Sequence, residues 1–506
     1  MNKTQQQQLR NKVMSWFWPL TLSIAMAVML YPVMNQYSQS FKFVDEAEHM
    51  VMAWLMGKGY RLYQNFPNNH QPLPYMASYL TQYLSQIDNV YMLIRRHRQV
   101  IFIWSAAWWV ILIKRFGKKA AVPIFLFESL KYLLLGNQFL AESLVVYPLS
   151  YLSGSLLDLK EKAVSKWGEL GIGILTGLIQ FTLLPMAAAL TLLTLFRYLK
   201  IKGKDFGWFI LGIISVIIGV FIVVPPKDYL IEVINALRYS LPGLTPIKHW
   251  WEIWRLPGLP FLYLFHIKDI LSQTVGLIMI FWLLALGRLI YLKQKTQALV
   301  VLGLLIIWLS TNTRVAEANV YYYRGFHLIP WLGIGLLVSF LAAWPTWMSL
   351  RQKWRLAVGL GIGVWMIVIL TKPNLPLYTQ INPETEHYIQ FTPMVQAAEM
   401  IKRLKQPGDR LMVIPNEALI YYLADLEPAP TNMLTYYDWQ VQVPKNRWLF
   451  FKTLNETPPT FIVYEDDGSS YSPMMNEYLK SKYLPIKPGS IVYLNRQELV
   501  RMTKEK

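Results

Sequence analysis

The chain has 506 residues, of which 54% are hydrophobic and only 16% charged, and its mean hydropathy is +0.28. Lipid can solvate such an apolar surface and water cannot, so a polytopic membrane protein is predicted. Cysteine is absent, which excludes disulfides, thiolate nucleophiles and cysteine-ligated zinc. The formal charge of +19 is not assigned to nucleic-acid binding, because no soluble segment combines a basic face with stacking aromatics.

Apolar runs long enough to cross a bilayer, which takes roughly 20 residues, recur as far as residue 371. The first extends from about Val13 to Tyr31 and is interpreted as a span rather than a cleaved signal peptide, since no small-residue cleavage site follows it. Further spans are expected near residues 99–113, 120–135, 139–157, 168–183, 185–198, 207–224, 272–292, 297–311, 326–348 and 355–371. The total is about 11 transmembrane helices.

Clusters of Lys and Arg fall on every second connection between these spans. They lie at Lys114–Lys119, Lys160–Lys166, Arg197–Lys204, Arg288–Lys295 and Arg351–Arg355. Because cytoplasmic connections are enriched in basic residues, the alternation predicts a cytoplasmic N-terminus and an outer C-terminus in the plasma (inner) membrane.

Three segments on the predicted outer side are distinctive. Residues 35–98 contain two expected helices, Glu46–Gly57 and Pro72–Gln86, and residues 225–270 are rich in Trp, Tyr and Pro and are expected along the membrane interface. The third segment, Thr311–Gly325, is short and contains Arg324.

From about residue 371 the composition becomes that of a soluble domain. Strands are expected at Leu411–Ile414, Phe461–Tyr464 and Ile491–Leu494, and helices at Pro393–Lys405, Asn416–Ala424 and Met474–Tyr483. Alternating strands and helices predict an α/β fold. We therefore expect a transmembrane domain over residues 1–371, with its first outer loop at 35–98, and a small extracytoplasmic α/β domain over residues 372–506.

An acidic run, Asp45-Glu46-Ala47-Glu48-His49, follows the first span. Charge at the mouth of a membrane helix is costly, so these residues are functional-site candidates. Asp45 and His49 are four residues apart and share one helix face, whereas Glu46 faces elsewhere, toward a second ligand or a structural partner. Glu48 is interpreted as an acid favoured by the helix dipole.

His70 opens the run His-Gln-Pro-Leu-Pro-Tyr, which ends at Tyr75. The prolines fix the chain and favour a contact between His70 and a phosphate or another anion, the alternative being a surface histidine in a loop. Metal binding by Asp45, His49 and His70 is a minor alternative, because no ligand-spacing motif supports it. No cofactor is expected.

Arg324 and His327 lie at the outer mouth of a late span. A guanidinium stays charged and binds two phosphate oxygens, and the alternative for Arg324 is an interfacial side chain that reaches the lipid headgroups. Glu142 sits at the edge of another span, where a carboxylate needs a partner, so it is either a hydrogen-bond hub of the core or part of the site. Arg96 and Arg98, just before the second span, are interpreted as interface anchors.

The order of these motifs resembles that of the GT-C glycosyltransferases. The bacterial protein-mannosyltransferase-like and aminoarabinose-transferase-like families, with the lipopolysaccharide-core glycosyltransferases of rhizobia, are the most similar. Asp45-Glu46 resembles their acidic pair, and His70 to Tyr75 resembles a Lys/His-Pro-Pro-Leu-x-Tyr run in which Gln71 replaces the first proline. Asn137 to Glu142 is similar to an acidic entry to the fourth span, Tyr323 to Pro330 to an Arg-Tyr stretch before a late span, and the C-terminal pattern to the family's appended outer domain.

This resemblance implies a GT-C fold and an inverting glycosyltransferase of cell-envelope assembly. The enzyme would move a hexosyl or pentosyl group from a polyprenyl-phosphate donor to a hydroxyl of a lipid, glycan or protein at the outer membrane face. The residue roles implied are Asp45 as catalytic base, Glu46 as acceptor contact, His70 and Arg324 as ligands of the donor phosphate, and His49, Tyr75, Glu142 and His327 as lining residues.

Other classes remain as alternatives. A transporter or flippase also has many spans, but it should show internal repeats and broken polar helices at midplane, whereas the polar candidates here gather at the outer mouths. O-antigen polymerases and ligases usually place their large outer loop late, and this chain has it directly after the first span. A non-catalytic assembly or lipid-binding protein is the third alternative.

Overall fold

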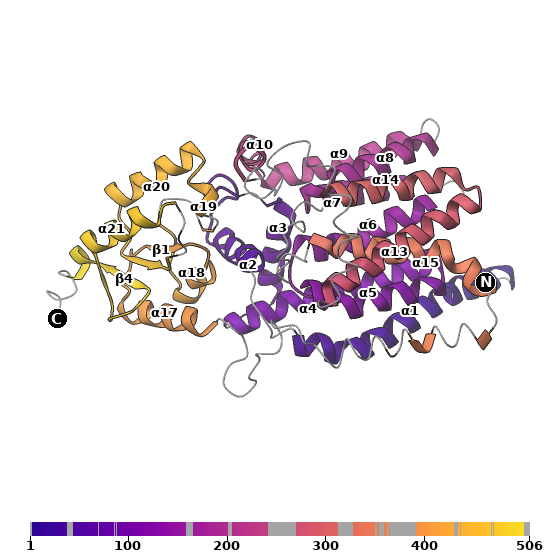
Figure 1. Ribbon diagram of the computed structural model, residues 1–506, viewed down its shortest axis with the longest axis horizontal. Coiled ribbons are helices and arrows are strands. Elements are labelled where there is room, and N and C mark those ends of the chain that lie inside the picture. Colours follow the sequence, from indigo (N-terminus) through magenta and orange to yellow (C-terminus); the bar gives the residue numbers. More distant parts are fainter. Residues whose placement is uncertain are drawn as a thin grey trace. The chain divides into compact units, whose positions relative to one another are not determined.

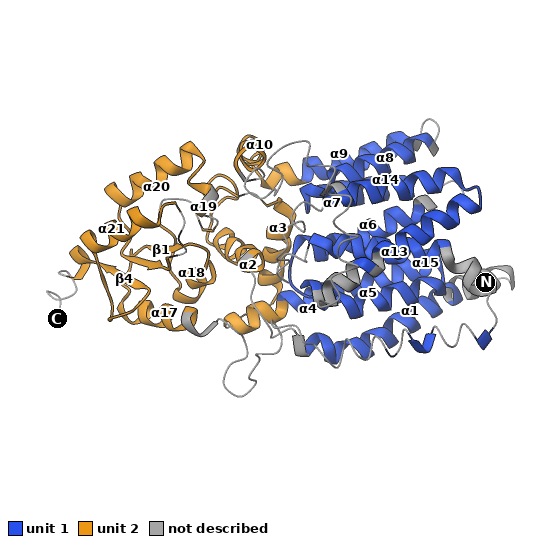
Figure 2. Cartoon of the chain, viewed as in Figure 1, with its two compact units in different colours: residues 1–39, 97–219, 246–380 blue, residues 40–96, 220–245, 381–506 orange. Residues whose placement is uncertain are grey.

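The chain separates into two compact units, each built from three stretches of sequence. Unit 1 comprises residues 1–39, 97–219 and 246–380, and unit 2 comprises residues 40–96, 220–245 and 381–506 (Figure 2). The computed structural model describes residues 3–37, 44–68, 70–85, 87, 89–157, 165–200, 205–240, 270–311, 327–349, 352–353, 359–361, 364, 391–429, 434–435, 437–466, 468 and 470–499. The predicted domain boundary near residue 371 stays a prediction, and the contacts add that the first outer loop and the C-terminal region share a unit.

Unit 1 is a bundle of apolar helices. Its helices are α1 (Lys3–Tyr37), α4 (Val90–Phe116, whose first turns belong to unit 2), α5 (Ala121–Leu130), α6 (Ala141–Leu157), α7 (Lys166–Gln180), α8 (Ala187–Lys200), α9 (Asp205–Val223), α13 (Ile270–Tyr291), α14 (Lys295–Thr311) and α15 (Ile329–Ser349). Helix α15 packs against α6 and α13, and α14 packs against α8 (Figure 1). A helix lies at each span predicted up to residue 348, whereas the last predicted span, 355–371, falls largely outside the described residues.

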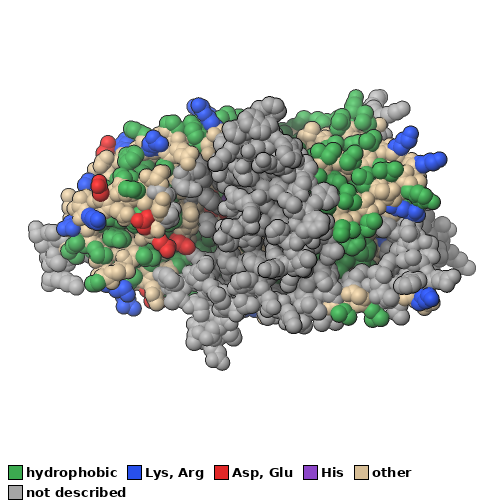
Figure 3. Space-filling view, viewed as in Figure 1, with side chains coloured by type: hydrophobic (Ala, Val, Ile, Leu, Met, Phe, Trp, Pro, Cys, Tyr) green, Lys and Arg blue, Asp and Glu red, His purple; other side chains and the backbone are tan. Residues whose placement is uncertain are grey.

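The lengths and surfaces of these helices fit a bilayer. Within the described ranges, three helices are long and apolar enough to cross a membrane: Met14–Asn35, Val90–Phe116 and Phe206–Val223. Shorter apolar helices lie at Leu184–Leu199, Met279–Tyr291, Lys295–Leu309 and Ile329–Ala342. Figure 3 shows apolar side chains over much of the visible described surface of unit 1, while acidic side chains are visible on unit 2. An apolar surface of this extent is what lipid solvation allows.

Helices α7 and α9 touch through their backbones. A Cβ atom on Gly173 of α7 would lie 1.9 Å from the carbonyl oxygen of Phe209, and one on Gly212 of α9 would lie 2.3 Å from that of Leu170. Glycines at such positions let membrane helices approach closely, and van der Waals packing then holds them together. The α7–α9 pair therefore depends on the absence of side chains at these two positions.

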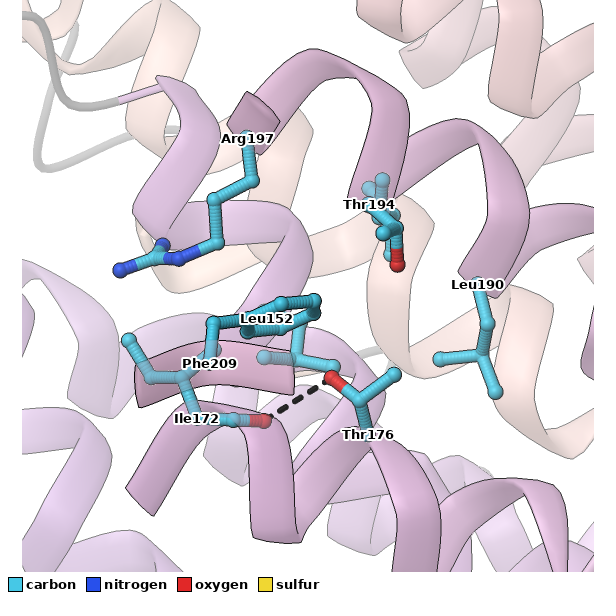
Figure 4. Close-up of a pocket in the computed structure, with 8 residues that line it drawn as sticks. Leu152, Ile172, Thr176, Leu190, Thr194, Arg197 and Phe209 are labelled. Carbon is cyan, nitrogen blue, oxygen red and sulfur yellow. Dashed lines mark hydrogen bonds between the residues drawn. The ribbon is translucent and has the colours of Figure 1, made fainter. Parts of the chain in front are cut away.

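A small, mostly apolar cavity lies among α6, α7, α8 and α9 (Figure 4). Two of its polar lining residues, Thr176 and Arg197, are bound within the protein. Thr176 donates a hydrogen bond of 2.9 Å to the Ile172 carbonyl, and the Arg197 guanidinium binds both carboxylate oxygens of Glu169 at 2.6 and 2.8 Å. The buried Glu169–Arg197 pair thus joins α7 to α8, because each charge satisfies the other.

The start of α1 lies beside the connection after α4. The ammonium groups of Lys114 and Lys118 lie 2.8 and 3.6 Å from the ring centroids of Trp16 and Trp18, respectively, within the range of cation–π attraction. These contacts place the first half of α1 beside the C-terminal end of α4 and the residues that follow it. The cytoplasmic orientation itself stays a prediction.

Unit 2 combines the first outer loop with an α/β region. Helices α2 (Val44–Gly57), α3 (Pro72–Leu84) and α10 (Pro226–Asn235) precede α17 (Phe391–Leu404), α18 (Leu419–Ala424), α19 (Tyr437–Gln440), α20 (Pro444–Glu456) and α21 (Ser472–Lys482). The strands are β1 (Leu411–Ile414), β2 (Phe461–Tyr464), β3 (Tyr483–Pro485) and β4 (Val492–Asn495). They form a sheet in the order β1-β2-β4-β3, in which β1 and β2 are parallel and the other pairs antiparallel.

The core of this region confirms the predicted small α/β fold. Side chains of Met412 and Ile414 on β1 and Ile462 on β2 pack with Phe450 of α20 and Met475 of α21, all at most 1% exposed. The expected strands are present within one residue of their predicted ends. Strand β3 was not predicted, because it has only three residues and ends in a proline, which is tolerated on an edge strand.

The turn after α2 is tied to the α/β region at two points. Lys58 forms an ion pair of 2.9 Å with Asp425, and the Tyr60 hydroxyl donates to Glu427 at 2.7 Å. The ring of Trp54 meets that of Tyr422 edge-on, with 5.9 Å between centroids. Helix α2 is therefore anchored at its C-terminal end, which fixes where its acidic first turn lies within unit 2.

The α7–α9 contact yields a test with a control on the same helix. Gly173→Ala should lower the thermal stability of the protein, by about 1–3 kcal/mol, because its methyl group would meet backbone atoms of α9 that cannot move aside. Gly171→Ala is the matched control, since nothing lies within 4 Å of its Cβ position. Thermal unfolding in detergent measures both, and an equal stability of the two variants would contradict the close backbone contact.

Candidate functional site

The first turn of α2 brings Asp45 to His70. Oδ2 of Asp45 lies 3.9 Å from Nε2 of His70, and the two side chains are 15% and 22% exposed, respectively. This distance is within ion-pair range and too long for a hydrogen bond. The pair is therefore partly open to solvent.

His49 completes this group, one helical turn after Asp45. Its ring centroid lies 5.3 Å from that of His70 and 5.0 Å from that of Tyr75, both in edge-on arrangements. His49 is 2% exposed, and Glu46, in the first turn of the same helix, is also 2% exposed. The structure thus gathers four of the predicted site residues within unit 2, namely Asp45, His49, His70 and Tyr75.

The backbone of His70 is held from two sides. Its N–H donates to Oδ1 of Asn68 at 2.8 Å, and its carbonyl accepts from the Tyr63 hydroxyl at 2.6 Å. The next residue, Gln71, caps the N-terminus of α3 in an extended conformation, and Pro72 follows it in the first turn, where proline suits the helix start. The position of His70 is therefore set by its neighbours' hydrogen bonds and by the start of α3.

Glu48 is a buried junction of several segments. It is 1% exposed and accepts hydrogen bonds from the Asn68 side-chain amide, from the Tyr75 hydroxyl at 2.9 Å and from the Thr435 hydroxyl at 2.8 Å. A buried carboxylate needs such donors to offset its loss of hydration. The helix dipole alone does not account for Glu48, because its carboxylate joins α2 to the loop before α3, to α3 itself and to the C-terminal region.

Helix α10 supplies a contact that sequence reasoning missed. The Tyr229 hydroxyl donates to Oε1 of Gln71 at 2.7 Å, and the Tyr229 ring meets the Tyr63 ring edge-on at 5.4 Å. The residue that departs from the family's proline motif, Gln71, therefore has a partner of its own. The sequence did show a polar residue, Gln71, at the position of the motif's first proline. No local pattern indicated that its partner lies 158 positions away.

Glu232, one turn after Tyr229, is a titratable group near the same loop. Burial raises its pKa from 4.5 to about 7, while the charge of Lys445, the Asn235 side chain and the Asn68 backbone N–H lower it. Burial also raises the pKa of Tyr63 well above its ordinary value and that of Tyr229 above it. Both tyrosines therefore remain neutral hydrogen-bond donors across the physiological pH range.

The structure describes some of the residues that were singled out in unit 1 and not others. Oε1 of Glu142 lies 3.1 Å from Nδ1 of His327, so the expected partner of this carboxylate is one of the other predicted residues. Arg324 lies outside the described residues. The interpretation of Arg98 as an interface anchor was wrong: the side chain is 1% exposed, and an anchor needs its guanidinium at the surface.

A second buried network in unit 1 was not predicted. Lys131 and Glu128 form an ion pair of 2.6 Å, Tyr147 donates to Glu128, and Trp109 donates to the Tyr147 hydroxyl at 2.8 Å. The available signal was the presence of two opposite charges three residues apart in a predicted span, a pattern that marks a paired, structural or functional position. These contacts join α4, α5 and α6 to one another and to Lys131, which directly follows α5.

The chemistry open to the Asp45 group is proton transfer and anion contact. A partly exposed carboxylate can accept a proton, and a histidine beside it can donate to an anionic oxygen. Among the described side chains, no group of three His, Asp or Glu residues is arranged to hold a metal ion. The expectation that no cofactor is required stays a prediction.

Comparison with solved structures identifies the fold. The apo crystal structure of ArnT from Cupriavidus metallidurans aligns with a TM-score of 0.53 and 14% identity, covering 95% of this chain and 98% of that chain. The structure of the same protein bound to undecaprenyl phosphate aligns with a TM-score of 0.53, 13% identity and the same coverage. Both structures have the GT-C membrane fold, so the predicted fold is confirmed. No family model and no curated protein sequence matches the chain.

The raised pKa of Glu232 predicts a pH-dependent stability. Its neutral carboxyl contributes stability that is complete below about pH 4.5 and is lost as the pH rises to about 7, because the unfolded chain releases this proton more readily. The loss is at most about 3 kcal/mol. The melting temperature of the wild type, relative to that of Glu232→Gln, should therefore fall between these pH values.

The control is Glu477→Gln, which removes an exposed glutamate of α21. Its melting temperature should follow that of the wild type at every pH. A constant difference between the wild type and Glu232→Gln from pH 4.5 to pH 8 would contradict the raised pKa.

Proposed function

We propose that this protein is an inverting glycosyltransferase that moves a sugar from a polyprenyl-phosphate donor to an acceptor hydroxyl at the outer face of the membrane. The observation that carries the proposal is the pairing of Asp45 with His70 at 3.9 Å, in the two motifs whose order resembles the GT-C enzymes. The fold supports it, because a protein of the same fold binds undecaprenyl phosphate.

The solubility of the lipid chain and the charge of the phosphate are the reasons for proposing a polyprenyl-phosphate donor. A polyprenyl chain dissolves in the bilayer that the apolar helices of unit 1 occupy, and its phosphate carries the sugar to the interface. His70 and Arg324 bind this phosphate and stabilise the charge that grows on it as the sugar leaves. His49 and Tyr75 are proposed as lining residues in unit 2. Glu142 and His327, whose Oε1 and Nδ1 atoms lie 3.1 Å apart, are proposed as lining residues in unit 1.

The reaction is a single displacement. Asp45 accepts the proton of the acceptor hydroxyl, whose oxygen attacks the anomeric carbon. The bond between that carbon and the phosphate oxygen breaks, and the electron pair leaves with prenyl phosphate, so the anomeric configuration inverts and no sugar is attached to the enzyme. Glu46 contacts the acceptor and orients it.

The setting follows from the charge pattern of the connections. The N-terminus lies in the cytoplasm, and the first outer loop and residues 372–506 lie outside the plasma (inner) membrane. The transferred group is a hexosyl or pentosyl group, and the acceptor is a lipid, a glycan or a protein of the cell envelope.

A substitution at Asp45 tests the assignment of the base. Purified protein is incubated with a panel of polyprenyl-phosphate sugars, and the release of prenyl phosphate is measured with water or extracted envelope lipids as acceptor. Asp45→Asn should lower kcat by about 100- to 10,000-fold, because the amide cannot accept the proton, while donor binding remains. Asp466→Asn, at an exposed aspartate of unit 2, is the control and should keep the wild-type rate. Turnover by Asp45→Asn near the wild-type rate would contradict the assignment of Asp45 as the catalytic base.

Substitutions of the phosphate ligands should affect the donor. His70→Ala and Arg324→Ala should each raise the KM for the donor and lower kcat, because a lost phosphate contact weakens both ground-state and transition-state binding. His70→Lys should retain much of the activity, since lysine is the other residue type of the motif. An unchanged donor KM in both alanine variants would remove these residues from the phosphate site.

The same assay separates the transporter alternative. Protein reconstituted into vesicles that moves polyprenyl-phosphate sugars across the bilayer, without consuming any of them, would favour a flippase and contradict the transferase.

A further inference from the structure

We propose that Asn68 is a positioning residue: held by the buried carboxylate of Glu48, its side chain fixes the backbone of His70 and so places the His70 ring at the donor phosphate. The proposal rests on the role of His70 in the proposed function. Sequence reasoning gave Asn68 no part, because it lies in a turn before the motif and carries no charge.

Both ends of the Asn68 amide are used. Its oxygen accepts the His70 N–H at 2.8 Å, and its nitrogen donates to Oε1 of Glu48. Asn68 is 5% exposed, so water does not readily replace either partner. A change at this position therefore acts on His70 directly through one atom and on Glu48 through the other.

The chemistry of the partners fixes the orientation of this amide. A carboxylate only accepts hydrogen bonds and a backbone N–H only donates, so the amide nitrogen must face Glu48 and the amide oxygen must face His70. The Glu48 carboxylate is itself held by Tyr75 at 2.9 Å and Thr435 at 2.8 Å. The geometry at His70 is thus set by a buried group whose own position is fixed by α3 and the C-terminal region.

The other side of the loop is held by α10. Tyr229 binds Gln71 at 2.7 Å, and the backbone N–H of Asn68 interacts with the Glu232 carboxyl. Tyr63 binds the His70 carbonyl at 2.6 Å. Gln71, which follows His70, and Asn68, two positions before it, are therefore both held by hydrogen bonds. The amide of Asn68 is a direct side-chain link between His70 and Glu48.

The effect on the reaction is through placement. Small displacements of a group that must meet a reacting phosphate cost as much as about 100-fold in rate. Asn68 touches neither donor nor acceptor in this account, so its loss should appear as weaker use of the donor, in the same kinetic parameter that His70→Ala changes.

The first experiment compares two asparagines of the same loop. Asn68→Ala should raise the donor KM by about 10- to 100-fold. Asn65→Ala is the matched control, because Oδ1 of Asn65 also accepts a backbone N–H, which is that of Arg61 at 2.6 Å in place of that of His70. The double variant Asn68→Ala with His70→Ala should be no worse than His70→Ala alone, because both changes act through the same ring. Additive losses would assign Asn68 a general structural effect and overturn its role as a positioning residue.

A second pair of variants exchanges the charge and the amide. Asn68→Asp should impair donor use more than Asn65→Asp does, because it places a second carboxylate against Glu48. Adding Glu48→Gln should restore part of the lost donor use. The new amide nitrogen takes the place of Oε1 and donates to the new carboxylate, while the amide oxygen takes the place of Oε2 and still accepts from Thr435. The Tyr75 hydroxyl, which donates to Oε1 in the wild type, then accepts from the amide nitrogen. Failure of the exchange to restore any activity in a protein with wild-type melting temperature would contradict the proposed geometry.

A readout independent of turnover separates this proposal from the proposed function. The rate at which diethyl pyrocarbonate modifies His70, followed by mass spectrometry of the full-length protein in detergent, should change in Asn68→Ala and not in Asn65→Ala. An unchanged His70 rate together with an unchanged donor KM in Asn68→Ala would overturn the positioning role. A changed rate of His70 modification in Asn68→Ala, together with a wild-type donor KM in His70→Ala, would instead uphold the positioning role of Asn68. The same pair of results would refute the proposed contact between His70 and the phosphate.

Discussion

The buried carboxylate of Glu48 is the interaction on which the candidate site depends. It receives hydrogen bonds from Asn68, Tyr75 and Thr435, which belong to the loop, to α3 and to the C-terminal region. Removal of an acceptor from such a junction leaves several buried donors unpaired, and each unpaired donor costs about 1–3 kcal/mol. The junction explains how an outer loop near the start of the chain and a sheet near its end form one compact unit.

The two units differ in the side chains they expose and in how their buried groups are packed. Unit 1 exposes apolar side chains, packs α7 and α9 through glycines, and closes its buried charges in pairs such as Glu169–Arg197. Unit 2 has a buried α/β core and carries the Asp45–His70 pair. A polyprenyl-phosphate sugar combines a lipid tail, a phosphate and a polar group, so a protein with both kinds of unit suits such a donor.

Local spacing predicted most of the elements, and it singled out several residues that lie near one another around Asp45. The four-residue spacing of Asp45 and His49 and the proline run after His70 led to residues that the structure brings together. The partners that hold them were not predictable in this way, because Tyr229 lies 158 positions from Gln71 and Thr435 lies 387 positions from Glu48. Periodicity reports which residues share a face, whereas tertiary packing decides what that face meets. The error at Arg98 has the same origin. A basic residue at the boundary of a predicted span is expected to be exposed, and only the tertiary packing shows that this one is buried.

The central claim is that the bond between the anomeric carbon and the donor phosphate is the one that breaks. The most direct measurement is mass spectrometry of the prenyl phosphate released by the purified protein in water enriched with oxygen-18, with water as acceptor. Attack at the anomeric carbon predicts that the released prenyl phosphate contains no oxygen-18 and that the sugar does. Oxygen-18 in the prenyl phosphate, or a complete panel of polyprenyl-phosphate sugars left intact with either water or envelope acceptors, would contradict the account.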